Sequence, residues 1–240
     1  MTAHHPTLVS PRVAGALYLA IIALGLFGEA VVRGTLVVSG DAANTASQIL
    51  GSQTLWRVGI STDLLMHVLD VPLIVFFYLL LRPVSQPIAL LATVFNIVQT
   101  CVLAGNKLTL LAALAILGSA GSAKAESHAL ASLAIELHGY GFGIGLVFFG
   151  LACVARGYLL FQSGFVPRAI GVLLGLAGIS YLVNSFALLL SPSFAAVLFP
   201  AVLLPAFLGE LFLSVWLLFT SDRDLQQRMA PAALRRGQAR

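Results

Sequence analysis

Six apolar runs, each about as long as a bilayer is thick, occupy most of this 240-residue chain. A helix needs about 20 consecutive apolar residues to cross the roughly 30 Å of hydrocarbon in a membrane. Read as helices, the runs predict an all-α, polytopic membrane bundle. Its expected spans are residues 12–33, 57–81, 87–118, 129–160, 167–190 and 196–220.

Composition supports this fold class and excludes a soluble domain. Hydrophobic residues make up 59% of the chain, charged residues only 9%, and the mean hydropathy is +0.99. Almost nothing is left outside the spans to build a second domain. We therefore expect an amino-terminal tail (1–11), a six-span membrane domain (12–220) and a basic carboxy-terminal tail (221–240).

The distribution of Lys and Arg predicts the orientation, because cytoplasmic loops are enriched in these residues. The basic tail then marks a cytoplasmic terminus, and nucleic acid is not an expected partner. Both termini are predicted to be cytoplasmic, with the lipid bilayer as the one certain partner. The basic residues counted on the cytoplasmic side are Arg12, Arg82, Arg156, Arg168 and the tail arginines, among them Arg235, Arg236 and Arg240. Those counted on the opposite side are Arg33, Arg57, Lys107 and Lys124.

The longest external connection, residues 34–55, contains a short helix. Asp41 begins the run Asp41-Ala-Ala-Asn-Thr-Ala-Ser-Gln-Ile-Leu50 as an N-cap, so we expect a capped helix on the outer surface. It is either a lid or a packed connector. Cys101 and Cys153 fall at different depths of neighbouring spans, too far apart for a disulfide.

Polar residues within the spans concentrate in the outer half of the membrane. Ionisable groups at such depth are costly and usually face a protein interior or a watery cavity. Asp63, His67 and Asp70 follow one another by four and three residues, which places them on one helix face. We predict a polar pocket that opens outward and is closed toward the cytoplasm. Its candidate residues are Asp63, His67, Asp70, Asn96, Gln99, His138, Tyr140, Asn184 and Glu210.

Several kinds of chemistry stay open at this pocket. Glu29 and Arg33 are four residues apart and are expected to form an ion pair at the interface. His67, His138, Asp70 and Glu210 are weak candidate ligands for a divalent metal, since no signature such as HExxH accompanies them. His67 and His138 could also ligate haem. The sequence leaves metal and cofactor unknown.

Several strings of the chain resemble a bacterial membrane family catalogued as domain of unknown function 4386, over roughly residues 10–220. The resemblance implies a bacterial inner-membrane protein of about six spans and implies no activity, because that family is uncharacterised. His67 is not matched to the family's pattern. The resemblance therefore favours the other site candidates, Asp63, Asp70, His138, Asn184 and Glu210. The strings are Arg12-Val-Ala-Gly-Ala-Leu-Tyr18, Gly40-Asp-Ala-Ala-Asn-Thr-Ala46, Asp63-Leu-Leu, Leu80-Leu-Arg-Pro83, His138-Gly-Tyr-Gly-Phe-Gly-Ile-Gly-Leu-Val-Phe-Phe-Gly150, Arg156-Gly-Tyr158, Ser163-Gly-Phe-Val-Pro-Arg168, Tyr181-Leu-Val-Asn-Ser-Phe186 and Gly209-Glu210.

Three functions compete. The leading hypothesis is an outward pocket that binds or transports a small polar or amphipathic ligand, because Asp70 and Glu210 lie deep with no basic residue evident at their level. The second is an intramembrane enzyme, metal-dependent or not, that acts on a lipid-like substrate with His138 and the acids as base or ligands. The third is a structural or partner-binding protein whose acids are neutral or paired with Arg57 and Lys107 to fix helix packing.

Overall fold

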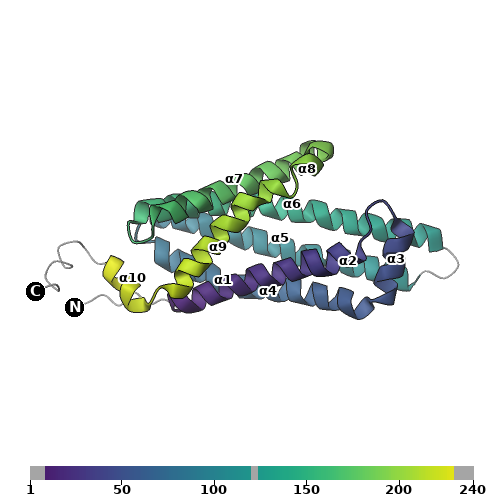
Figure 1. Ribbon diagram of the computed structural model, residues 1–240, viewed down its shortest axis with the longest axis horizontal. Coiled ribbons are helices and arrows are strands. Elements are labelled where there is room, and N and C mark those ends of the chain that lie inside the picture. Colours follow the sequence, from purple (N-terminus) through teal and green to yellow (C-terminus); the bar gives the residue numbers. More distant parts are fainter. Residues whose placement is uncertain (1–8, 120–123, 230–240) are drawn as a thin grey trace, which may run out of the picture.

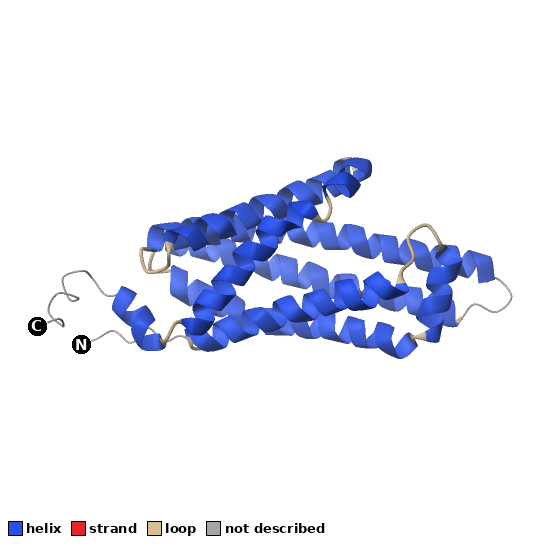
Figure 2. Ribbon diagram, viewed as in Figure 1, coloured by secondary structure: helices blue, strands red, loops and turns tan. Residues whose placement is uncertain are grey.

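The computed structural model describes residues 9–119 and 124–229, and this part of the chain is a bundle of long helices without a strand (Figures 1 and 2). Six helical segments are long and apolar enough to cross a membrane, which confirms the all-α, six-span prediction. They are α1 (Pro11–Leu26), continued by η1 (Phe27–Arg33) and α2 (Gly34–Leu36); α4 (Gln53–Leu81); α5 (Gln86–Gly118); α6 (Lys124–Ser163); α7 (Arg168–Leu190); and η2 (Ala201–Leu203) with α9 (Leu204–Phe219).

Three short helices complete the described chain: α3 (Ala42–Gly51), α8 (Pro192–Leu198) and α10 (Asp222–Met229). The start of the predicted basic tail is thus helical. Ser221 caps α10: its hydroxyl accepts from the Asp224 backbone N–H at 3.1 Å, and the Asp224 carboxylate accepts from the Ser221 N–H at 3.2 Å. The Ser221 hydroxyl also donates to the Asp224 carboxylate at 2.5 Å, and this bond, together with the one from the Ser221 N–H, holds the pKa of Asp224 below its ordinary value. Most of the predicted amino-terminal tail and the tail arginines Arg235, Arg236 and Arg240 lie outside the described residues.

The sixth span differs from its predicted range of 196–220. The chain leaves α8 at Phe199 and enters the separate helix α9 through η2, so the span begins at Ala201. Pro205 lies in the first turn of α9, where its missing N–H costs no helical hydrogen bond. Pro72 lies inside α4, which continues past it.

The bundle is elongated, and its two ends are named by what lies there (Figure 1). The termini end is where the described chain begins and ends, and the α3 end is where α3 lies. At 1.5 Å per residue, the 40 residues of α6 extend about 60 Å, roughly twice the hydrocarbon thickness. At the α3 end α3 lies across the long helices and packs against α5 and α6. The predicted cap is confirmed, because Asp41 Oδ1 accepts from the Asn44 N–H at 2.9 Å. The buried Trp56 closes this layer by donating to the Leu110 carbonyl at 3.0 Å.

At the termini end, α1 and α9 lie in direct backbone contact. A Cβ at Gly15 would overlap the backbone of Ser214 and Leu218, so only glycine permits this approach. Toward the α3 end the two helices diverge (Figure 1). The main apolar core, which includes Tyr18, Phe76 and Phe77, fills the closed end of this wedge. The wedge between α1 and α9 is the feature that positions the candidate site.

Candidate functional site

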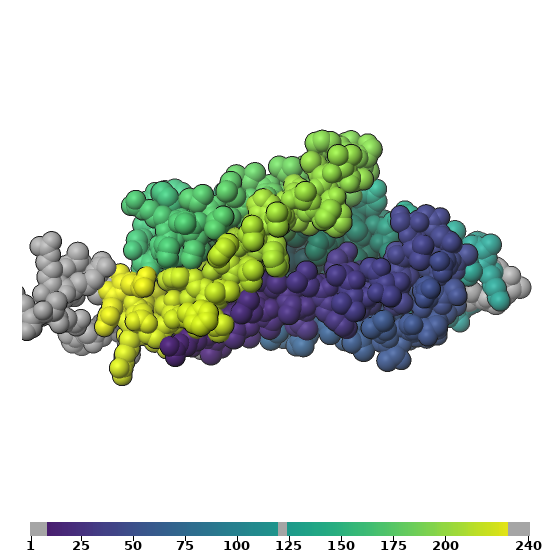
Figure 3. Space-filling model, viewed as in Figure 1, coloured from purple at the N-terminus to yellow at the C-terminus, as the bar shows by residue number. Residues whose placement is uncertain are grey.

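A cavity of about 290 Å³ lies in the wedge between α1 and α9. Its walls come from α1, η1, α4, α5, α6, α7, η2 and α9. The space-filling view shows the surface hollowed between α9 and the part of α1 that lies toward the α3 end (Figure 3). Leu26 of α1 and Phe207 of α9, both lining residues, are 51% and 39% exposed. Both helices are long and apolar enough to span a membrane, so the cavity opens sideways, between two candidate spans.

Most of the wall is apolar. Aliphatic, methionine and phenylalanine side chains surround a smaller number of charged and hydroxyl groups, an arrangement typical of sites for ligands that are largely hydrocarbon. The apolar lining residues are Ile21, Ile22, Leu26, Met66, Leu73, Leu103, Phe142, Leu146, Phe149, Leu203 and Phe207.

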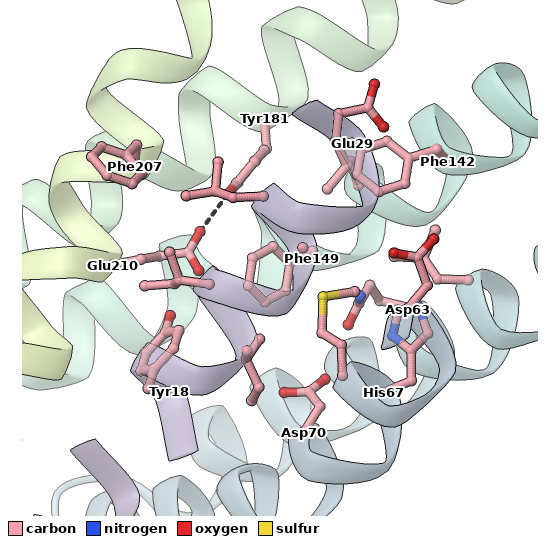
Figure 4. A pocket seen from close by; sticks show the side chains of 18 of the residues that line it. Tyr18, Glu29, Asp63, His67, Asp70, Phe142, Phe149, Tyr181, Phe207 and Glu210 are labelled. Carbon is pink, nitrogen blue, oxygen red and sulfur yellow. Dashed lines mark hydrogen bonds between the residues drawn. The ribbon is translucent and has the colours of Figure 1, made fainter. Parts of the chain in front are cut away.

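Helix α4 contributes three polar groups from one face. Asp63, His67 and Asp70 are all buried and all line the cavity (Figure 4). The opposite face of α4 carries exposed Val68 and Val71, which are suited to contact with lipid. The pattern is therefore that of a membrane helix with its polar side turned inward, as the spacing predicts.

Asp63 is the centre of a buried ion-pair network. Its Oδ2 accepts from Arg33 Nη1 at 2.7 Å and from Lys107 Nζ at 2.9 Å. Arg33 Nε also donates to Glu29 Oε2 at 2.7 Å, so Glu29 and Arg33 form the ion pair that their spacing predicts. These two residues belong to η1, a π-helical segment of the kind often found at functional sites. Gly28 in the same segment leaves room for Asp63, because a Cβ there would overlap Oδ1.

Two buried polar atoms at this end of the cavity have no hydrogen-bond partner within the described chain. They are Asp63 Oδ1 and His67 Nε2. Buried polar atoms are almost always satisfied, and an unsatisfied one commonly marks a place where a water or a ligand binds. Both atoms belong to residues that line the cavity.

Asp70 belongs to a second network, deeper toward the termini end. Its Oδ2 accepts from Thr100 Oγ1 at 2.6 Å and from Asn96 Nδ2 at 2.9 Å. The same Asn96 amide donates to Gln99 Oε1 at 2.8 Å, and its Oδ1 accepts a hydrogen bond from Arg156. The Arg156 guanidinium also lies 4.9 Å from the centroid of the Phe77 ring, a cation–π contact.

Arg156 corrects the sequence interpretation in two ways. It was counted among the basic residues of the cytoplasmic side although the predicted span 129–160 contains it; it lies within α6, is only 4% exposed and lines the cavity. The expectation that no basic residue lies at the level of Asp70 is therefore wrong, because Asp70 and Arg156 both bond to Asn96.

Glu210 occupies the α9 side of the cavity and is buried. It accepts a hydrogen bond from the Tyr181 hydroxyl of α7, and Tyr18 of α1 faces the same carboxylate (Figure 4). Phe149 packs against Tyr181 with 5.3 Å between ring centroids. Tyr18 also lines the cavity. It was not predicted as a site residue, because a tyrosine in an apolar helix is common in ordinary cores.

The predicted site residues divide into those that line the cavity and those that do not. Asn96 supports Asp70 from behind. His138 is held by Asn106, whose Nδ2 lies 3.0 Å from His138 Nδ1 and 2.8 Å from its carbonyl oxygen. Tyr140 is exposed and Asn184 is half-buried, and neither lines the cavity. The lining members are Asp63, His67, Asp70, Gln99 and Glu210, joined by Glu29, Arg33, Lys107 and Arg156.

The candidate metal ligands are not brought together. Among the described residues, no three His, Cys, Asp or Glu side chains form a group that could hold a metal ion. The pairing of His67 with His138 for haem is not assembled at the cavity either, because His138 does not line it. The absence of a disulfide is confirmed for Cys101 and Cys153, both of which are free.

Helix α3 does not line the cavity, so no contact at the cavity supports a lid role for residues 34–55. Thr45, Ala46 and Ile49 are buried against the neighbouring helices. The Thr45 hydroxyl also accepts from the Val38 N–H at 2.9 Å. These contacts are those of a packed connector.

Comparison with known proteins gives a family and no activity. The family model described as "Domain of unknown function (DUF4386)" matches residues 13–220. An uncharacterised protein of Archaeoglobus fulgidus is 29% identical over 154 residues, which cover 64% of this chain and 78% of that relative. No solved structure matches.

Proposed function

This chain belongs to the DUF4386 family, and we propose that it binds a small amphipathic ligand that enters its cavity sideways from the bilayer. The observation that carries the proposal is the lateral opening of a largely apolar cavity between α1 and α9. Hydrocarbon in the ligand matches the aliphatic wall, and a polar head matches the charged groups.

The unpartnered atoms favour a binding site over a network that serves only helix packing. A packing network is expected to satisfy its own polar groups, since an unsatisfied buried donor or acceptor costs about 1–3 kcal/mol. Asp63 and Lys107 do form such a packing contact. Asp63 Oδ1 and His67 Nε2, however, stay without a partner in the described chain and belong to residues that line the cavity.

We propose further that the α3 end faces outward and that both termini lie in the cytoplasm of a bacterial cell, with the protein in the inner membrane. With Arg156 and Lys107 buried and Arg33 half-buried in the bundle, fewer basic residues contribute to the positive-inside comparison. Those that remain still favour this orientation. At the termini end they are Arg12, Arg82, Arg168, Arg223 and Arg228, against Arg57 and Lys124 at the α3 end.

The test uses full-length protein in lipid nanodiscs and octanol that carries a photoreactive diazirine. After irradiation, mass spectrometry of the peptides maps the labelled residues. We expect adducts on lining residues from both sides of the wedge, such as Glu29 and Glu210. Leu146→Trp, which extends an indole into the cavity, should reduce these adducts severalfold. Leu91→Trp, at a position that is exposed toward lipid, is the matched control and should leave them unchanged.

Labelling confined to lipid-facing residues, or cavity labelling that is insensitive to Leu146→Trp, would contradict the proposed function. Thermal unfolding of both variants serves as the folding control.

A further inference from the structure

The charged groups that line the cavity do not balance. Besides His67, the lining contains four carboxylates and three cations: Glu29, Asp63, Asp70 and Glu210 against Arg33, Lys107 and Arg156. The lining therefore has one formal negative charge in excess. In a setting of low dielectric constant, such an excess favours a monovalent positive charge brought by a ligand.

The excess charge can be assigned to Glu210. Glu29 pairs with Arg33, and Asp63 pairs with Lys107. Asp70 and Arg156 share the side chain of Asn96.

Glu210 has no ion-pair partner among the described residues, where the salt bridges all involve Glu29 or Asp63. Its hydrogen-bond donor is the neutral phenol of Tyr181. Glu210 is nevertheless buried, with only 7% of its surface exposed.

Aromatic rings surround this carboxylate. Tyr18, Phe149, Tyr181 and Phe207 come from four different helices and all line the cavity near Glu210 (Figure 4). The face of an aromatic ring attracts a cation, and rings around a carboxylate are the chemistry that recognises substituted ammonium groups. A metal ion is poorly matched here, because no three His, Cys, Asp or Glu side chains gather at one point among the described residues.

We infer that the cavity selects organic cations: Glu210 and the four rings form a subsite for an ammonium head group, while the aliphatic wall holds the alkyl tail. The inference rests on the proposed function, because it specifies the head group of the same ligand. Phe207, at the opening, is the first of the rings that a ligand arriving from the bilayer would meet.

The experiment measures protection against the photoreactive octanol by three competitors with the same tail. They are octyltrimethylammonium, octanol and octyl sulfate. On the wild-type protein, octyltrimethylammonium should protect the cavity at the lowest concentration and octyl sulfate at the highest. The quaternary head has no N–H group, so its advantage reports charge and ring contacts alone.

Glu210→Gln should raise the protecting concentration of octyltrimethylammonium by about tenfold or more, because a buried charge loses its partner. Protection by octanol should stay unchanged, which also shows that the variant is folded. Glu136→Gln removes an exposed carboxylate of α6 outside the cavity and is the matched control. Phe207→Leu, at the exposed rim, should raise the protecting concentration of octyltrimethylammonium by roughly two- to fivefold.

Equal protection by the three competitors on the wild-type protein would overturn the inference, whatever the variants do. An unchanged preference for the cation in Glu210→Gln would overturn it as well. Both results leave the proposed function intact, because that function fails only if the photoreactive octanol does not label the cavity or if the labelling is insensitive to Leu146→Trp.

Discussion

At the scale of single residues, Asp63 takes part in two of the three salt bridges found among the described residues. It is 1% exposed and pairs with two cations, the half-buried Arg33 and the buried Lys107. Asp63→Asn would leave both cations without their shared carboxylate. We expect a loss of about 3–5 kcal/mol of unfolding free energy, measured by equilibrium unfolding in detergent.

The control for this prediction combines Asp63→Asn with Lys107→Met. Removing the stranded ammonium should restore part of the lost stability. If the two substitutions instead add their separate losses, the ion pair does not account for the stability of this region.

Residue identities were predictable where spacing alone decides them. Asp63, His67 and Asp70 share a face because helical geometry requires it, and in the structure all three are buried and line the cavity. The burial of Arg156 was missed because a basic residue near the end of an apolar run was counted with the cytoplasmic side. Its burial depends on Asn96 and Phe77, which come from other helices and could not be paired with it from sequence.

At the scale of elements, the wedge depends on how closely α1 and α9 approach at the termini end. Gly15→Val would place side-chain atoms against the backbone of Ser214 and Leu218 and push the helices apart. We expect a destabilisation of about 1–3 kcal/mol in equilibrium unfolding, together with altered photolabelling of the cavity. Gly105→Ala, where a Cβ meets open space, should cause no loss and is the control. Equal stability of the two variants would refute this role for Gly15.

The number and type of the helices followed from hydropathy, because each span must be long and apolar by itself. Helix ends were less predictable. The break before α9 and the extension of α6 to 40 residues depend on what each segment packs against, and this information is not local. The same is true of His138, which Asn106 holds outside the cavity.

At the scale of the whole molecule, the orientation is open to a direct test. In a background of Cys101→Ser and Cys153→Ala, single cysteines are placed by Gln53→Cys at the α3 end and Asp222→Cys at the termini end, both at exposed positions. A membrane-impermeant maleimide should label the first in intact cells and the second only after permeabilisation. The reverse pattern would place the cavity at the opposite leaflet.

The sideways opening between α1 and α9 also determines how the protein samples its ligand. A site that opens to the bilayer draws from a two-dimensional reservoir, whose content depends on how strongly a molecule partitions into lipid. Occupancy should then follow the molar ratio of ligand to lipid and not the total concentration of ligand in the sample. Adding extra vesicles to a fixed amount of ligand and protein would lower the occupancy of the site even though the total ligand is unchanged.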